Sequence, residues 1–147
     1  DVEPQGGTPL APGVRTMKIV LETEHRIRLV PDDAGFAFEA VEGGLSPFHL
    51  LAASLATCTY SVIHSWAHQA GLDMAGLEIV VAWEFGGDPV QVSRMDMDIA
   101  WPGLPPVRRE AARRVAEHCT VHHTLMAPTT VETRVAANDE AGPADGA

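Results

Sequence analysis

Positive charge is scarce in this sequence. Ten Lys and Arg residues stand against twenty Asp and Glu residues, which gives a net charge of −10 at pH 7, and Lys18 is the only lysine. Nucleic acids and anionic membrane surfaces are bound through clusters of basic side chains. The excess of acidic residues therefore argues against nucleic acid and against a membrane as partners.

A long apolar run is also missing. A membrane-spanning helix needs about 18 consecutive apolar residues, and the most apolar stretch here is interrupted by His49, Ser54 and Thr57. The first residues, Asp1-Val-Glu-Pro, do not show the basic region and apolar region that are typical of a signal peptide. We therefore expect a cytoplasmic protein.

The motifs of several enzyme and cofactor classes are absent as well. No G-x-S-x-G motif marks a serine nucleophile. The glycine pairs Gly43-Gly44 and Gly86-Gly87 lack the spacing of a phosphate-binding loop. No pair of cysteines has the spacing of a zinc finger. We therefore expect no bound cofactor and no metal ion.

Cysteine is nearly absent, with two residues in 147. A chain of this length with 46% hydrophobic residues forms a core without disulfide staples. Two thiols in a cytoplasmic protein indicate catalysis or metal binding more than a structural bridge. Each of Cys58 and Cys119 is either a small buried core residue or a reactive thiol. Burial in apolar surroundings raises the pKa of a thiol, whereas a nearby cation or helix N-terminus lowers it.

The histidines offer an alternative chemistry. His118, His122 and His123 flank Cys119, and His64 and His68 lie one helical turn apart on a different element. Histidine and cysteine are good zinc ligands. A His/Cys metal-binding protein therefore remains an alternative, although the two histidine clusters are far apart in the sequence.

The first half of the chain predicts strands followed by a long helix. Apolar residues alternate with polar ones at 14–21, 26–30 and 36–39, a period typical of strands. Ser46 and Pro47 then favour the start of a helix and Gly71 its end.

The predicted helix over 47–70 is apolar nearly all round in its first half, whereas a surface helix has a polar face. A domain of this size rarely surrounds a helix, so we expect a partner subunit to cover part of it. Cys58 lies too far from the start of this helix for the helix dipole to lower its pKa. An arginine from another element would have to do so.

The second half predicts a hairpin of strands at 77–85 and 95–101, then a helix that starts at Pro105-Pro106, and a last strand at 129–136. In that helix an apolar stripe in steps of four reaches Cys119, which would close the helix: Val107, Ala111 and Val115.

This order of elements predicts an α+β fold with a mainly antiparallel sheet and helices on one face. We expect one domain over 14–136, with loosely held ends at 1–13 and 137–147, which are rich in glycine and proline or in small polar residues.

The sequence resembles the OsmC/Ohr family in three segments: Gly43-Gly-Leu-Ser-Pro47 with Leu50-Leu-Ala-Ala, Cys58-Thr, and, 61 residues after Cys58, Cys119-Thr-Val-His-His-Thr-Leu125. The resemblance runs over residues 14–135. It implies an OsmC-like fold, in which antiparallel sheets wrap around long central helices in an intertwined homodimer with active sites at the subunit interface.

The resemblance also implies a function. Characterised members of the family are thiol-dependent peroxidases that reduce small organic hydroperoxides. By analogy, Cys58 attacks the peroxide oxygen and becomes a sulfenic acid, Cys119 condenses with it to a disulfide, and a dithiol reductant reopens the disulfide.

The sequence departs from the peroxidase members at one position. Those members carry a Glu directly after the Pro at the helix start, and it orients an Arg onto the reactive thiolate, whereas Phe48 stands at that position here. The sequence is therefore closer to the less characterised OsmC-like branches. The candidates to activate Cys58 are basic side chains on several elements: Arg15, Arg28, His49, His122 and His123. Phe48 also motivates a second hypothesis, a non-catalytic OsmC-fold dimer that binds a small apolar ligand at the subunit interface.

Overall fold

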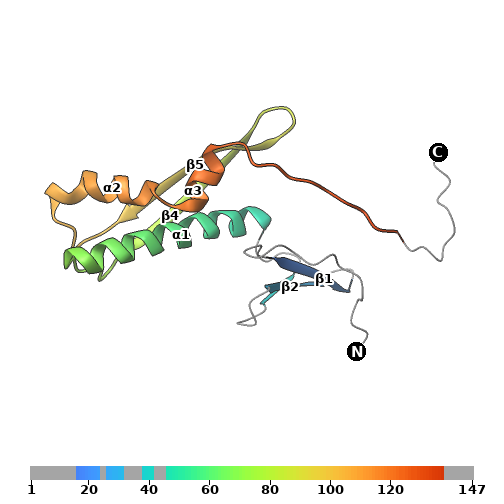
Figure 1. Ribbon diagram of the computed structural model, residues 1–147, viewed down its shortest axis with the longest axis horizontal. Helices are drawn as coiled ribbons and strands as arrows, with labels where there is room; N and C mark the ends of the chain where they lie inside the picture. Colours follow the sequence, from blue (N-terminus) through green and yellow to red (C-terminus); the bar gives the residue numbers. More distant parts are fainter. Residues whose placement is uncertain (1–15, 24–25, 32–37, 42–45, 138–147) are drawn as a thin grey trace. The chain divides into compact units, whose positions relative to one another are not determined.

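A computed structural model describes residues 16–23, 26–31, 38–41 and 46–137 (Figure 1). The chain divides into two compact units, Asp1–Ala53 and Ser54–Ala147, whose boundary falls inside the first helix. Apart from Ala137, the ends that were predicted to be loosely held lie outside the described residues. The single domain over 14–136 stays a prediction.

The first unit contains an antiparallel sheet of three strands in the order β1-β2-β3: β1 (Met17–Thr23), β2 (Arg26–Pro31) and β3 (Phe38–Val41). Ile19 pairs with Leu29 across the first two strands. The three strands predicted from alternation are confirmed, with bounds that differ from the predicted ones. The predicted start of the first strand, at residue 14, lies outside the described residues.

The helix α1 (Pro47–Ala70) begins as predicted. The Ser46 Oγ accepts a hydrogen bond of 3.2 Å from the backbone N–H of His49, and the His49 Nδ1 accepts one of 3.2 Å from the backbone N–H of Ser46. This reciprocal pair is a capping box in which a histidine ring takes the place of the usual Glu or Gln. It satisfies two N–H groups that a helix start otherwise leaves unpaired.

The same helix ends at a glycine, also as predicted. Gly71 has a φ of 67°, a left-handed conformation that glycine adopts without steric cost. The Leu72 N–H donates to the Ala67 carbonyl at 2.9 Å, and the Gly71 N–H donates to the His68 carbonyl at 3.4 Å. These two bonds form a Schellman motif. The chain therefore turns back immediately after the helix, and Leu72 joins the core against Ala67.

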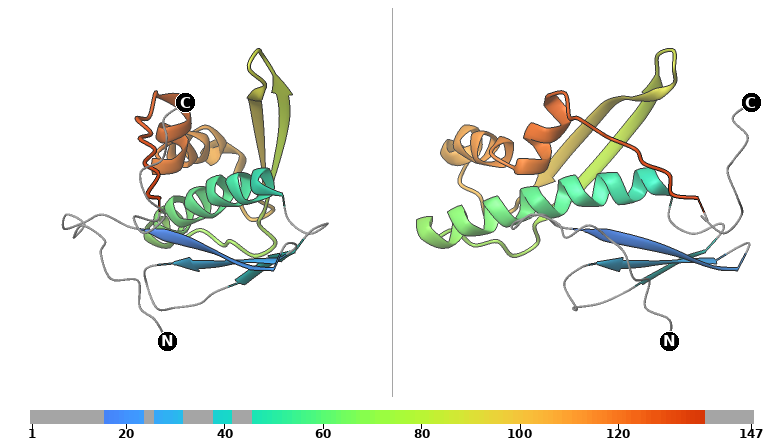
Figure 2. Two further views of the ribbon diagram at one scale, coloured as in Figure 1. Left: turned by 90° about the vertical axis from the view of Figure 1, so that its right-hand side faces the viewer. Right: turned by 45° about the vertical axis from the view of Figure 1, so that its right-hand side comes forward.

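The second unit continues with an antiparallel hairpin, β4 (Glu78–Gly86) and β5 (Gln91–Ala100). Ile79 pairs with Ile99, and both are half-buried. The predicted hairpin is confirmed, although its second strand begins earlier than expected. The views agree that the tip of the hairpin extends away from the helices (Figures 1 and 2).

The core of the second unit lies at the base of this hairpin. Ile63 and Ala67 of α1 are fully buried there against Trp101. The Trp101 Nε1 donates a hydrogen bond of 2.7 Å to the Asp73 carbonyl, so its polar atom is satisfied inside the protein. The remaining members of the cluster come from the second helix and from the connecting turns: Ala112, Ala116, Trp66, Leu72, Met74, Leu77, Ile99 and Leu104.

The second helical region differs from the prediction. It begins with a 3-10 turn, η1 (Pro106–Arg108), before the helix α2 (Arg109–Glu117). A 3-10 turn has about 3.0 residues per turn against 3.6 in an α-helix, so steps of four counted from Val107 lose their phase. Val107 is 90% exposed, and the buried residues are Ala112 and Ala116.

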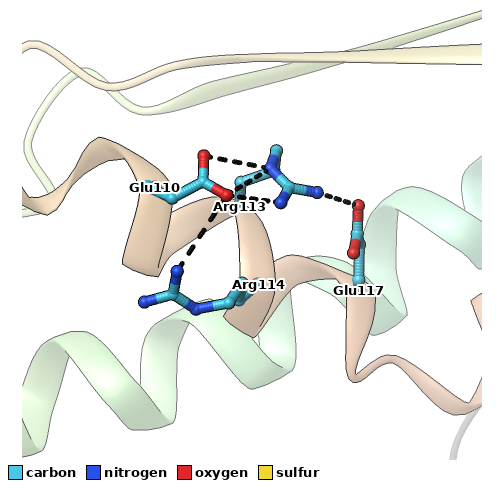
Figure 3. Close-up of polar contacts among 4 residues, drawn as sticks. All are labelled: Glu110, Arg113, Arg114 and Glu117. Carbon is cyan, nitrogen blue, oxygen red and sulfur yellow. Dashed lines mark hydrogen bonds and ion pairs between the residues drawn. The ribbon is translucent and has the colours of Figure 1, made fainter.

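The polar face of α2 carries an exposed network of ion pairs (Figure 3). The Arg113 guanidinium bonds to Glu110 and, at 2.6 Å, to Glu117, while Arg114 lies 4.0 Å from Glu110. These partners stand three or four residues apart, a spacing that places them on the same face of a helix. Arg113 and Arg114 therefore face solvent.

A third helix, α3 (Thr120–Met126), was not predicted. The helix α2 ends at Glu117, and His118 and Cys119 connect it to α3. Cys119 therefore does not close the second helix. It has an extended conformation, with φ −71° and ψ 132°, and is the N-cap residue of α3.

The predicted last strand at 129–136 is wrong for this structure. The segment after α3 forms no strand and runs as an extended chain (Figure 1). Val131 and Val135, which alternate with polar residues as in a strand, are 82% and 90% exposed. A strand needs a neighbour for its backbone hydrogen bonds, and this segment has none within the described part of the chain.

Candidate functional site

The two cysteines meet where α1 faces the start of α3. Cys58 lies in the middle of α1, and Cys119 precedes the first residue of α3. Their side chains are within hydrogen-bonding reach of each other, and both thiols are free. The two residues are 61 positions apart in sequence, so the folding of α2 and α3 back onto α1 is what brings the sulfur atoms together.

Cys58 has the environment of a reactive thiol. Its side chain is only half-buried, so it is open to small molecules. Its pKa is lowered, first by a hydrogen bond from the Cys119 side chain and then by the backbone N–H of Val121, with a smaller contribution from the backbone N–H of Thr120. Burial opposes this shift. Hydrogen bonds to the charged form favour the thiolate.

Cys119 has the opposite environment. It is fully buried, and burial is the main cause that raises its pKa, followed by the hydrogen bond to Cys58. Its Sγ accepts a hydrogen bond of 3.4 Å from the backbone N–H of His122. That bond caps α3 and acts in the opposite direction, lowering the pKa of the thiol. Of the two thiols, Cys119 is therefore the one that ionises second.

The groups that lower the pKa of Cys58 differ from those that the sequence predicted. We expected an arginine or histidine side chain, but the groups that lower its pKa in the structure are a thiol and backbone N–H groups. Of the two candidate arginines, Arg15 lies outside the described residues, and Arg28 lies on β2, in the other unit. A role for either one stays a prediction.

The candidate histidines are engaged in other ways. The ring of His49 takes part in the capping box with Ser46. His122 acts on Cys119 through its backbone N–H, whereas its ring stacks edge-on against that of His123 with the ring centres 6.3 Å apart. Phe48, which stands where peroxidase members have Glu, lies in the first turn of α1 and is 37% exposed.

The histidines do not assemble a metal site. Across residues 16–23, 26–31, 38–41 and 46–137, no group of three or more His, Cys, Asp or Glu side chains converges as metal ligands would. His64 is instead packed against the ring of Tyr60 at 5.8 Å. The arrangement of side chains therefore gives no support to the metal-binding alternative.

Sequence reasoning missed three participants. Val121 and Thr120 act through their backbone N–H groups, and a backbone group leaves no signature in a sequence. Thr59 contacts Cys119 through its hydroxyl, and its position directly after Cys58 is the one available signal. A residue next to a cysteine on a helix points about 100° away from it, so this position alone does not indicate a contact with the redox pair.

The comparison with protein families identifies the family of the chain that carries this site. The sequence model described as "OsmC-like protein" matches residues 40–134, a span that includes both cysteines. The chain belongs to the OsmC-like protein family. A comparison with curated proteins found no match for this OsmC-like protein.

Solved structures agree with the family. An OsmC-like protein of Mycoplasma pneumoniae is similar with a TM-score of 0.63 at 17% identity, over 79% of this chain and 89% of that one. A protein of Psychrobacter arcticus, provisionally described as an osmotic stress induced and detoxification response protein, has a TM-score of 0.68 at 24% identity, over 78% and 90% of the two chains. An organic hydroperoxide resistance protein of Elizabethkingia anophelis has a TM-score of 0.58 at 13% identity, over 77% and 89%.

At these identities the similarity shows the OsmC-like fold alone, because one fold serves many functions. The expected α+β fold is thereby confirmed. None of the helices in the described part of this OsmC-like protein has the length and hydropathy that crossing a bilayer requires.

Proposed function

We propose that this OsmC-like protein is a thiol peroxidase that reduces small organic hydroperoxides through Cys58 and Cys119. The observation that carries the proposal is the contact between two free thiols whose pKa values are shifted in opposite directions. The lowered pKa of Cys58 favours the thiolate form that a nucleophile needs. The raised pKa of Cys119 favours its protonated form until Cys58 has been oxidised.

The reaction has two chemical steps before the enzyme is regenerated. The Cys58 thiolate attacks the terminal oxygen of the hydroperoxide, so that a sulfur–oxygen bond forms and the oxygen–oxygen bond breaks. The alkoxide that leaves takes one proton from water and becomes an alcohol. Cys119 then attacks the sulfur of the Cys58 sulfenic acid, and a disulfide and one water form. An external dithiol reopens the disulfide by exchange, becoming a disulfide itself.

The different exposures of the two cysteines support this division of roles. Cys58 is half-buried, so a peroxide can reach it, whereas Cys119 is fully buried. A buried thiol is shielded from the substrate and reacts only with a sulfur that already lies beside it. Over-oxidation of a sulfenic acid competes with its capture by a neighbouring thiol, and contact between the two side chains favours capture.

The proposal includes a homodimer. The helix α1 buries only one face in the single chain, and Tyr60, next to that face, is 46% exposed. Val131 and Val135 in the extended segment after α3 are more exposed still. A second copy of the chain would cover such apolar surface and give the segment a strand neighbour. The reaction is placed in the cytoplasm, where dithiol reductants regenerate such thiols.

Titration of thiols before and after peroxide tests the proposal. The thiols are counted after the protein is unfolded. Without peroxide the count should be two per chain, and after one equivalent of cumene hydroperoxide it should be zero, with the mass change of one intramolecular disulfide. Cys119→Ser should stop at a Cys58 sulfenic acid that a β-diketone such as dimedone traps. Cys58→Ser should consume no peroxide, although it keeps one thiol and the same fold.

Two results would overturn the proposal. One is that peroxide leaves both thiols of the wild-type protein titratable. The other is that Cys58→Ser turns over peroxide at the wild-type rate. Saturable binding of an apolar probe that survives the loss of either cysteine, together with the first result, would favour the non-catalytic alternative.

A further inference from the structure

One fully buried polar side chain next to the redox pair has no evident partner. Thr59 follows Cys58 on α1 and is 0% exposed. Its Oγ1 is the single buried side-chain oxygen or nitrogen, among the residues that the structure describes, that lacks a hydrogen-bond partner. Leaving a buried hydroxyl unpaired costs about 1–3 kcal/mol, so the position of Thr59 calls for a physical reason.

Other hydroxyls in the same unit show what Thr59 does not do. The Ser61 Oγ, two residues further along α1, donates to the Thr57 carbonyl at 3.1 Å. The Thr124 Oγ1 on α3 donates to the Thr120 carbonyl at 2.8 Å. Both hydroxyls use the carbonyl four residues earlier, which is the usual solution for Ser and Thr inside a helix. The Thr59 hydroxyl makes no such bond to the carbonyl of Leu55, four residues earlier.

The neighbour of the Thr59 hydroxyl is the sulfur of Cys119. The hydroxyl makes no hydrogen bond to the sulfur in the resting protein, but it lies near enough to favour the charged form of Cys119 and so to lower the pKa of that thiol. It does not contribute among the groups that act on Cys58. Thr59 therefore distinguishes between two sulfur atoms that touch each other, and it favours negative charge on the one that is otherwise protonated.

We infer that the Thr59 hydroxyl is a positioning residue for the second chemical step: it turns its proton toward the Cys119 sulfur as Cys119 attacks the oxidised Cys58. This inference rests on the proposed function. In that step the sulfur–sulfur bond forms, the sulfur–oxygen bond of the sulfenic acid breaks, and the hydroxide leaves with the Cys119 proton as water. Thr59 donates a hydrogen bond and transfers no proton, so it is unchanged at the end.

The order of events explains why the hydroxyl is unpaired at rest. While Cys58 is a thiolate, its charge and its hydrogen bond both keep the proton on Cys119. Conversion of Cys58 to a neutral sulfenic acid removes both influences. The donors that remain beside Cys119 are then the backbone N–H of His122 and the Thr59 hydroxyl. A hydroxyl that is already buried and uncommitted reorients without breaking another bond.

Two substitutions at this position separate the hydroxyl from the packing. Thr59→Val replaces the hydroxyl by a methyl group of similar size, and it should fold, because removing an unpaired buried hydroxyl is neutral or stabilising. Thr59→Ser keeps the hydroxyl and removes a methyl. Ser61→Ala is the matched control on α1, because its hydroxyl already bonds to the Thr57 carbonyl.

The kinetic experiment follows both steps after mixing with cumene hydroperoxide. Thr59→Val should form the Cys58 sulfenic acid at the wild-type rate and close the disulfide about tenfold more slowly, the size expected of a hydrogen bond to a charged group. Thr59→Ser should restore most of the rate of closure, and Ser61→Ala should change neither step. Equal slowing of both steps in Thr59→Val, without rescue by serine, would overturn the inference and leave only a packing role.

A titration without peroxide tests the hydrogen bond independently of the proposed function. In a Cys58→Ser background the thiolate of Cys119 is followed by its ultraviolet absorbance against pH, with the variant lacking both cysteines as the blank. Adding Thr59→Val should move the midpoint to higher pH, and adding Thr59→Ser should not. An unmoved midpoint overturns the inference even if the wild-type protein reduces peroxide. A moved midpoint in a protein that ignores peroxide supports the bond and rejects only the peroxidase.

Discussion

Cys58 and Cys119 shift each other's pKa in opposite directions: the Cys119 side chain lowers the pKa of Cys58, and the hydrogen bond to Cys58 raises that of Cys119. Such a pair titrates as a unit, and its first proton leaves the sulfur that the surroundings favour as an anion. The backbone N–H groups of Val121 and Thr120 lower the pKa of Cys58, so they favour the loss of the first proton from Cys58. If the proposed function holds, Cys58 is therefore the first nucleophile of the pair and Cys119 the second.

Removing the Cys119 donor should raise the pKa of Cys58. Cys119→Ala takes away the largest of the influences that lower it, whereas the N–H groups of Val121 and Thr120 remain. At a fixed pH below the wild-type pKa, less Cys58 is then ionised, and its reaction with iodoacetamide should be slower. The measurement is the alkylation rate of Cys58 against pH, whose midpoint should move to higher pH.

Cys119→Ser is the control for this prediction, because a serine hydroxyl retains a donor at the same position. Its midpoint should lie between those of the wild-type protein and of Cys119→Ala. A midpoint in Cys119→Ala that is equal to or lower than that of the wild type would show that the backbone N–H groups alone stabilise the thiolate.

Part of this site was predictable from the sequence, and the reason lies in the length of its elements. The bounds of α1 follow from local signals, since Ser46 and Gly71 cap a helix of 24 residues that has no competing pattern. Cys58 was therefore placed on the correct element. Its partner was recognised from the family resemblance, because no local signal links residues 61 positions apart.

The geometry around Cys119 was not predictable in the same way. The apolar stripe was counted through η1 from Val107, and the tighter turn there moves the buried face onto Ala112 and Ala116. The stripe nevertheless ended at the right residue, because Cys119 is buried as the N-cap of α3 and not as the last residue of α2. Cysteine is not among the usual N-cap residues, so the seven-residue helix that follows had no recognisable start.

The turn after β5 offers a test of the core. The Trp101 Nε1 donates to the Asp73 carbonyl at 2.7 Å, and a Cβ at Gly103 would lie 2.6 Å from the same oxygen. Trp101→Phe should cost about 0.5–1.5 kcal/mol of unfolding free energy, because it removes this partly buried hydrogen bond. Gly103→Ala should cost about 1–3 kcal/mol, because backbone atoms must move apart.

The two changes act on one carbonyl, so they should not be additive. A shift of Asp73 that accommodates alanine at 103 already lengthens the Trp101 hydrogen bond. Urea unfolding of both single variants and of the double variant measures the coupling. The loss in the double variant should be smaller than the two single losses taken together. Full additivity would mean that the indole and the glycine do not share the carbonyl in solution.

The capping box at the start of α1 separates a structural from a catalytic role for His49. Because its Nδ1 accepts from the Ser46 N–H and its own N–H donates to the Ser46 Oγ, we expect His49→Ala to destabilise the fold by about 0.5–2 kcal/mol. His49→Gln should recover part of the loss, since glutamine is a usual capping-box residue. Thermal unfolding of the three proteins measures the effect. Both variants should keep the wild-type rate of Cys58 alkylation at each pH. A slower rate in His49→Ala that glutamine does not restore, at unchanged stability, would instead identify the imidazole as a further group that activates the Cys58 thiolate.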